Sequence, residues 1–245
     1  MRHRYFIYLS FDGTAYHGWQ IQPNGLSVQE VLQSRLSTLL RKSIEVVGAG
    51  RTDAGVHART MVAHFDWDAE IDEAQLAYKL NRMMPRDIAI NRIVEVEAHL
   101  HARFSATART YHYYIHTARN PFLRHYSLEM PYKLDFDAMN QAAATLVSVS
   151  DFGAFCKAGA DVKTTLCTLT EARWERMETD GRWCFVITAN RFLRNMVRAV
   201  VGTLIEVGRG RMSQADFAQV VASGTRQKAG ESMPGHALFL WDIKY

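Results

Sequence analysis

The most informative stretch of this sequence is residues 48–58, which read GAGRTDAGVHA. It sets one carboxylate, Asp53, between Arg51 and Gly55, and it lies between two apolar runs that are typical of strands. Glycine allows close approach of a bulky ligand, and a nearby arginine favours the ionised form of a carboxylate. Two interpretations are open: a polar turn between strands, which is the common outcome, or a loop that presents Asp53 for catalysis.

The composition is that of an ordinary globular protein. The chain has 245 residues, 48% hydrophobic and 22% charged, and this length indicates two domains or one large one. The longest apolar run, 196–207, is interrupted by Arg198, Gly202 and Glu206, so we expect no membrane span. Asp12 follows the first apolar run too soon for a secretory leader. We therefore expect a cytoplasmic protein.

Cysteine and histidine usage argues against a metal centre. The three cysteines are odd in number and form no Cys-x-x-Cys pair. Among the ten histidines, His99 and His101 would share one strand face, but they lack an acidic or sulfur partner at ligand spacing. We expect no metal, no cofactor and reduced core cysteines. Arginine supplies 22 of the 29 basic residues, and the net charge is +4. Arginine binds phosphate bidentately and stacks on bases, which favours an RNA ligand, although a genome-composition bias gives the same excess.

Strand and helix signals alternate along the first hundred residues. The pattern Ser27-x-x-Glu30 is a capping box that opens a helix, and Pro85 stops a second one. The order predicted is strand, helix, two strands that flank Asp53, helix and strand, over residues 5–11, 27 onward, 44–47, 61–67, 72–83 and 87–96.

A similar cycle begins again after His99. It predicts a strand, a helix, a strand pair, two helices and a closing strand, over residues 107–116, 136–147, 166–177 with 182–189, 192–207, 213–222 and 238–243. The strand pair is expected to turn at Asp180-Gly181. The repeated cycle predicts two α/β halves, 1–100 and 101–245. It is typical of an α+β fold whose helices cover one face of a mostly antiparallel sheet.

Four segments resemble, in the same order, the tRNA pseudouridine synthase A family. They are residues 11–20 with the helix start at 27–30, residues 50–58, residues 101–113 and residues 192–202. Ordered matches over most of the chain make chance a poor explanation. Residues 234–238 read PGHAL where the family has Pro-Ala-His-Gly-Leu, and the effect of this exchange on the local turn is left open.

The resemblance implies an activity, a substrate and an assembly. Family members isomerise uridine to pseudouridine in the anticodon stem-loop of tRNA, at positions thirty-eight to forty. They are homodimers in which tRNA contacts both subunits. Their two α/β halves are related by a pseudo-twofold, and their mostly antiparallel sheets join across a central basic cleft with the helices on the outer face.

The resemblance also assigns roles to three residues. Asp53 is the catalytic carboxylate, which either attacks C1′ of the ribose or removes a ribose proton. Arg198 is its ion-pair partner, and such a cation opposes the rise in pKa that burial causes in a carboxylate. Tyr111 stacks on the target uracil.

Other arginines are candidate RNA ligands. Arg191, Arg194 and Arg198 have i, i+3, i+7 spacing and are expected to share one face of the helix over 192–207. Such a stripe is most often solvated, but beside an active site it favours phosphate contact.

Arg109, Tyr111 and Tyr113 alternate along a strand and so share one of its faces, either as core or toward the substrate. Arg51 is assigned to RNA binding or base displacement. Three loop residues are also expected to face the cleft: Tyr16, Trp19 and Gln20.

Two other functions compete with this hypothesis. One is a non-catalytic RNA-binding module with the same basic cleft, which needs no particular carboxylate. The other is a glycosidase, which generally needs two carboxylates, and residues 50–58 contain no acidic residue besides Asp53.

Overall fold

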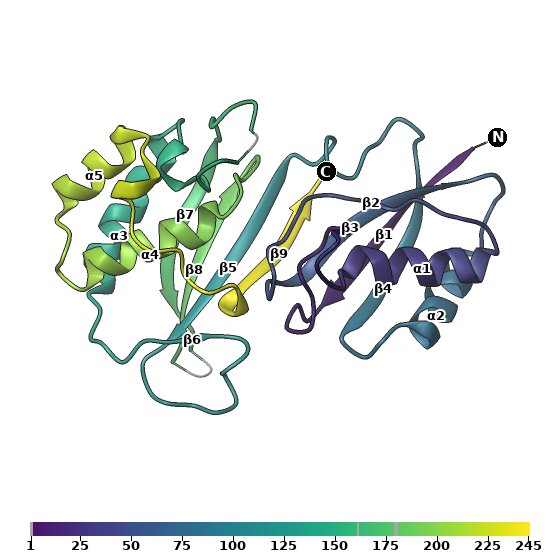
Figure 1. Cartoon of the computed structure of the whole chain (residues 1–245), viewed down its shortest axis with the longest axis horizontal. Helices are drawn as coiled ribbons and strands as arrows, with labels where there is room; N and C mark the ends of the chain where they lie inside the picture. Colours follow the sequence, from purple (N-terminus) through teal and green to yellow (C-terminus); the bar gives the residue numbers. More distant parts are fainter. Residues whose placement is uncertain (1, 161, 179–180) are drawn as a thin grey trace. The chain divides into compact units, whose positions relative to one another are not determined.

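The computed structural model describes residues 2–160, 162–178 and 181–245, which form two compact units. The N-terminal unit ends at Thr107 and also contains Phe239–Tyr245, and the C-terminal unit is Ala108–Leu238. The sequence analysis places the division at residue 100 and assigns the last strand to the second half. In the structure, this last strand belongs to the N-terminal unit. Helices combine with mostly antiparallel strand pairs in both units, so the predicted α+β class is confirmed (Figure 1).

The N-terminal unit is a sheet in the order β4-β1-β3-β9, with β2 on β3 and two helices. β1 pairs antiparallel with β3 and β4, whereas β9 pairs parallel with β3. The elements of this unit are β1 (His3–Phe11), α1 (Val28–Leu40), β2 (Val47–Gly48), β3 (His57–Trp67), α2 (Glu73–Met83), β4 (Ile88–Val96) and β9 (Leu238–Lys244).

Local sequence signals explain where these helices begin. Ser27 precedes α1 and accepts a hydrogen bond from the Glu30 N–H (3.2 Å), and Asp72 does the same for α2 from Gln75 (2.9 Å). Both predicted starts are confirmed. The apolar alternation of β1 places Tyr5, Ile7, Leu9 and Phe11 in the core.

The C-terminal unit is a sheet in the order β5-β8-β7, with β6 on β5. Asp135 and Ser213 cap two of its helices, as the sequence predicts. Asp180, part of the predicted turn, lies outside the described residues. The strands and α-helices of this unit are β5 (Ala108–His116), β6 (Leu128–Glu129), α3 (Phe136–Thr145), β7 (Leu169–Arg176), β8 (Trp183–Ala189), α4 (Met196–Gly208) and α5 (Gln214–Ser223).

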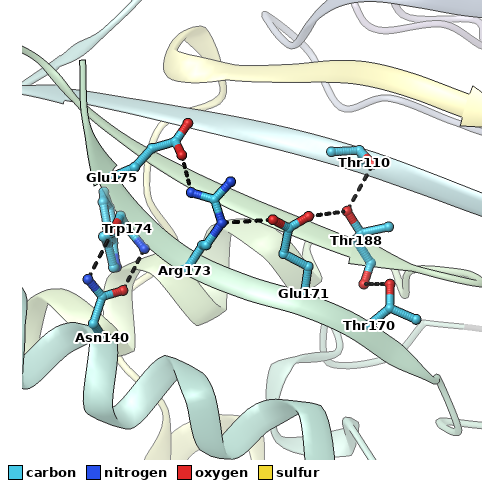
Figure 2. A network of polar contacts seen from close by, with 8 residues as sticks. All are labelled: Thr110, Asn140, Thr170, Glu171, Arg173, Trp174, Glu175 and Thr188. Carbon is cyan, nitrogen blue, oxygen red and sulfur yellow. Dashed lines mark hydrogen bonds and ion pairs between the residues drawn. The ribbon is translucent and has the colours of Figure 1, made fainter. Parts of the chain in front are cut away.

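Aromatic contacts fix α3 against this sheet. Phe136 stacks on Trp183 with ring centroids 3.8 Å apart, and it meets Trp174 edge-on at 5.5 Å. Asn140 of α3 accepts from the backbone N–H of Trp174 (2.7 Å) and donates to its carbonyl (3.0 Å), as Figure 2 shows. The side chain therefore replaces backbone partners at the edge strand β7.

A polar network on the opposite face links β5, β8 and β7 (Figure 2). The hydroxyls of Thr110 and Thr188 lie 2.9 Å apart, and Thr188 donates to Glu171 (3.1 Å). Arg173 donates to Glu171 (2.8 Å) and also contacts Glu175. A one-residue slip between strands turns every side chain to the other face. The network therefore supports the register that sets the direction of residue 111.

Helix α4 begins four residues later than the sequence predicts. Asn195, its N-cap, has a left-handed backbone (φ 68°), a conformation that asparagine tolerates better than most residues. Arg191 and Arg194 therefore precede the helix, and only Arg198 lies on it. The prediction that the three arginines share one helix face is wrong. In the described ranges, no helix is both long and apolar enough to cross a membrane.

The close approach of α4 to residues 230–233 generates a prediction. A Cβ on Gly202 would overlap the Glu231 carbonyl, whereas a Cβ on Gly208 would meet the flexible side chain of Met139. Alanine normally stabilises a helix interior relative to glycine by about 1 kcal/mol. We expect Gly202→Ala instead to lower the free energy of unfolding by about 1–3 kcal/mol through overpacking, and Gly208→Ala to cost less. Urea unfolding measures both, and equal stability of the two variants would contradict the contact.

Candidate active site

Asp53 lies in a turn that leads directly into β3. Its carbonyl accepts a hydrogen bond from the Val56 N–H (3.2 Å), and its side chain is half-buried. Gly55 has φ 75°, which only glycine adopts without strain, and its N–H donates to the carbonyl of Tyr16 (3.3 Å). The turn is thus tied to a second segment of chain, residues 12–20.

This second segment contacts the Asp53 turn backbone to backbone. A Cβ on Gly13 would overlap the carbonyl of Val56, and one on Gly18 (φ 86°) would overlap that of Thr52. Thr52 also accepts from the N–H of Trp19 (3.4 Å). The backbone is therefore held one residue before Asp53 and again three residues after it. Two motifs that are separate in the sequence form one structure here.

Buried side chains support the two loops from behind. Trp19 is 2% exposed, stacks on Phe11 and fills the space beside Gly48. Tyr16 is 4% exposed and donates its hydroxyl to Asp87 (2.7 Å), and burial raises the pKa of this phenol. The expectation that Tyr16 and Trp19 face a cleft is therefore wrong, whereas Gln20 is exposed.

His57 is a structural residue that the sequence analysis missed. The ring is 1% exposed, stacks on Phe239 of β9 at 4.5 Å, and accepts the N–H of Gly13 at Nδ1 (3.0 Å). A carboxylate oxygen of Asp12 lies 3.1 Å from the same nitrogen. The sequence did offer one signal for this role, because His57 stands at the first position of a buried strand.

Tyr111 and Arg109 lie on β5 in the C-terminal unit and share one strand face. Tyr111 is half-buried and meets Phe192 edge-on, with ring centroids 5.0 Å apart. Arg109 donates to the carbonyl of Asn190 (2.7 Å). Tyr113, two residues further on, is fully buried and donates to the carbonyl of Pro234 (3.0 Å).

Arg198 is anchored beside this row of side chains. Its Nε donates to the carbonyl of Met233 (2.5 Å), and Met233 donates its N–H back to the carbonyl of Arg198 (3.1 Å). Burial raises the pKa of Tyr113, and the charge of Arg198 partly opposes this rise. Adjacent carbonyls, at 233 and 234, thus hold Arg198 and Tyr113. The exchanged residues Gly235–Ala237 form one turn of 3-10 helix that leads into β9.

The candidate residues are divided between the two units. Asp53 and the exposed Arg51 belong to the N-terminal unit. Arg194 is exposed in the C-terminal unit, where its carbonyl accepts the N–H of Lys157 (3.0 Å). Within that unit, Tyr113 lies two residues from Tyr111 on the same strand face, and it interacts electrostatically with Arg198.

The cysteines and the potential metal ligands lie scattered in the described part of the chain. No group of three or more His, Cys, Asp or Glu side chains there could hold a metal ion. The three cysteines are buried and unpaired. Burial raises the pKa of Cys167 to about 11 and that of Cys184 to about 12, which disfavours the nucleophilic thiolate.

Comparison with known proteins identifies the class. A sequence profile described as tRNA pseudouridine synthase matches residues 7–105 and 142–245. The chain therefore belongs to the tRNA pseudouridine synthase family, and it is an isomerase. Asp53 and Arg198 lie within the matched stretches, whereas Arg109 and Tyr111 lie between them.

Curated relatives named tRNA pseudouridine synthase A match nearly the whole chain, which confirms the resemblance found in the sequence. The relative from Bacteroides fragilis is 56% identical over 243 residues, or 99% of this chain and 96% of the relative. That from Bacteroides thetaiotaomicron is also 56% identical, over 99% of this chain and 90% of the relative. That from Porphyromonas gingivalis is 51% identical over 244 residues, or 99% and 97%.

The backbone contact between the two loops predicts a difference between two glycines. A Cβ on Gly13 meets backbone, which cannot move aside as a side chain can, whereas a Cβ on Gly50 meets nothing within 4 Å. We expect Gly13→Ala to lower the free energy of unfolding by about 1–3 kcal/mol and to slow turnover. Gly50→Ala should change stability by less than about 0.5 kcal/mol. Thermal unfolding with a single-turnover assay tests this, and a Gly13→Ala variant as stable and active as the native protein would contradict it.

Proposed function

We propose that this synthase isomerises uridine at positions thirty-eight to forty, in the anticodon stem-loop of tRNA, with Asp53 as the essential carboxylate. The observation that carries the proposal is the interlocked pair of loops, which fixes the backbone on both sides of Asp53 while its side chain stays half-buried. Preorganised groups of this kind cost no reorganisation when the reaction occurs. The range of positions rests on the resemblance to the synthase A family.

The reaction needs few protein groups. The C1′–N1 bond breaks, the uracil turns, and a new bond forms from C1′ to C5. C5 loses its hydrogen as a proton and N1 gains a proton, so there is no net oxidation or reduction. Asp53 acts on the ribose, either by attack at C1′ or by removal of a ribose proton. The target nucleotide must leave its stack to reach this side chain, and the detached base must be held while it turns.

Tyr111 and Arg198 supply the other two functions. Tyr111 stacks on the uracil, and its edge contact with Phe192 limits the movement of its own ring. The resemblance to the synthase A family makes Arg198 the cation that pairs with Asp53, and such a cation favours the ionised carboxylate.

Binding of the tRNA involves further arginines and a second subunit. Arg51, Arg109 and Arg194 contact the RNA backbone beside the reacting nucleotide. The active form is a homodimer in the cytoplasm, where both subunits contact one tRNA. These assignments rest on the resemblance to the synthase A family and on the exposure of Arg51 and Arg194.

Mapping the modified nucleotides tests the choice of substrate position. We expect a tRNA transcript with uridines at positions thirty-eight to forty to gain pseudouridine there after incubation with the enzyme. The matched control has cytidine at these positions and should gain none. Chemical mapping by primer extension locates each pseudouridine. Modification outside the anticodon arm, or undiminished modification of the control transcript, would overturn the assignment.

Two substitutions at Tyr111 separate its ring from its hydroxyl. Tyr111→Phe should keep stacking on the base and the contact with Phe192, with weakened catalysis. Tyr111→Ala should lose much more, because base stacking on an aromatic side chain is worth about 1–3 kcal/mol. Single-turnover rates at saturating enzyme provide the comparison, with thermal unfolding as the folding control. Equal losses in the two folded variants would assign the role to the hydroxyl.

A further inference from the structure

The segment between β5 and β6, residues 117–127, carries basic and aromatic side chains outside the proposed active site. It forms a long loop beside the end of β5 (Figure 1). Phe122 is 86% exposed and Tyr126 is 38% exposed, so neither is needed to fill the core. Arg119, Arg124 and His125 lie in the same segment. Basic residues interleaved with exposed aromatic rings are typical of surfaces that bind RNA.

Hydrogen bonds within the segment give it a defined shape. The side chain of Asn120 accepts the N–H of Phe122 (3.0 Å), and its carbonyl accepts that of Leu123 (3.2 Å). Leu123 in turn accepts from Tyr126 (2.9 Å) and Ser127 (3.0 Å) at its carbonyl. The aromatic and basic side chains are therefore presented on an ordered turn.

A hollow of about 420 Å³ opens between this segment and the end of β5. We call it the Arg119 pocket, after one of its lining residues. Its polar side chains include two guanidiniums and one amide, and among the described residues that line it Glu129 supplies the carboxylate. The residues that matter for binding are His116, Arg119, Asn120, Arg124, Ser127 and Glu129.

A buried histidine in the wall of this pocket has an unsatisfied nitrogen. His116 is 5% exposed, and its Nδ1 lies 2.9 Å from the hydroxyl of Ser127. Its Nε2 is buried without a hydrogen-bond partner in the described part of the chain, and the nearest carboxylate oxygen, on Glu129, is 4.0 Å away. The hydroxyl can donate to or accept from Nδ1; in the tautomer in which Ser127 donates, Nε2 carries a proton and is a donor. A buried donor left unpaired is costly, so a bound acceptor would satisfy it.

We propose that the Arg119 pocket binds a backbone phosphate of the tRNA substrate, with Phe122 stacked on a neighbouring base. Arg119 and Arg124 match the charge and the planar bidentate geometry that phosphate oxygens favour. His116 adds a neutral donor, since burial lowers the pKa of its ring. An exposed aromatic ring beside the cations distinguishes a base-stacking ligand from a simple anion.

The nucleotide bound here is different from the one that reacts. His116 follows Tyr111 by five residues on the same strand, a separation of roughly 16 Å at about 3.3 Å per residue. The pocket thus holds a second point of the same tRNA and helps to set its register. Only the identification of the RNA as tRNA rests on the proposed function.

Salt-dependent binding tests the phosphate contact. The double variant Arg119→Gln, Arg124→Gln removes two charges from the pocket, and Arg176→Gln, Arg211→Gln removes two exposed charges elsewhere in the same unit. We expect the pocket variant to bind a tRNA transcript about tenfold more weakly. Its slope of log K against log salt should be less steep by about 0.7–0.9, the effect of one lost phosphate contact. The control variant should match the native protein. Equal affinities and slopes for the two double variants would overturn the proposal.

Photocrosslinking tests the proposed place of the base. A benzoylphenylalanine at position 122 should crosslink to one short stretch of the tRNA, whereas the same group at position 147, also exposed in this unit, should not. No crosslink from position 122, or equal crosslinking from the two positions, would contradict the contact. Neither readout needs turnover. The binding and crosslinking results would therefore remain valid if the enzyme did not modify positions thirty-eight to forty. Equally, modification at those positions would remain valid if the Arg119 pocket did not bind RNA.

Discussion

The interaction on which the candidate site depends is the backbone contact between residues 12–20 and residues 52–56. A Cβ at Gly13 or Gly18 would overlap a carbonyl of the opposite loop, so the contact depends on glycine at both positions. The first loop is itself held by the start of α1, where Val28 and Gln29 donate to the carbonyls of Gly18 and Trp19 (3.2 and 2.9 Å). The position of Asp53 therefore follows from β1, α1 and β3 together.

The C-terminal unit positions its residues by another means, strand register. Thr110, joined to Thr188 and through it to β7, fixes the face to which Tyr111 points (Figure 2). The carbonyls of Met233 and Pro234 then anchor Arg198 and Tyr113. Each unit thus orders its own candidate residues through contacts within that unit.

Sequence reasoning succeeded where the signal is local and failed where it is not. Helix starts at Ser27, Asp72, Asp135 and Ser213 are set by side chains within three residues of the helix, and all four were predicted. The predicted start of α4 was wrong, because the apolar spacing typical of the helix continues on both sides of Asn195. That spacing does not show that Asn195 has a left-handed backbone. The return of β9 to the N-terminal unit and the bond from Gly13 to His57 join residues far apart in the sequence, which periodicity cannot show. The roles of Asp53, Tyr111 and Arg198 came from family resemblance and stay predictions.

The most direct measurement of the central claim compares tRNA binding and turnover in Asp53→Asn. The substitution keeps the shape of the side chain and removes its charge and most of its nucleophilicity. We expect tRNA affinity within about tenfold of the native protein. Turnover should fall on the order of 10⁴-fold or more, as for the loss of an essential reacting group. Tritium release from uracil-labelled tRNA under single-turnover conditions, with filter binding on the same preparation, measures both. Substantial tritium release by the folded variant would remove Asp53 from the mechanism.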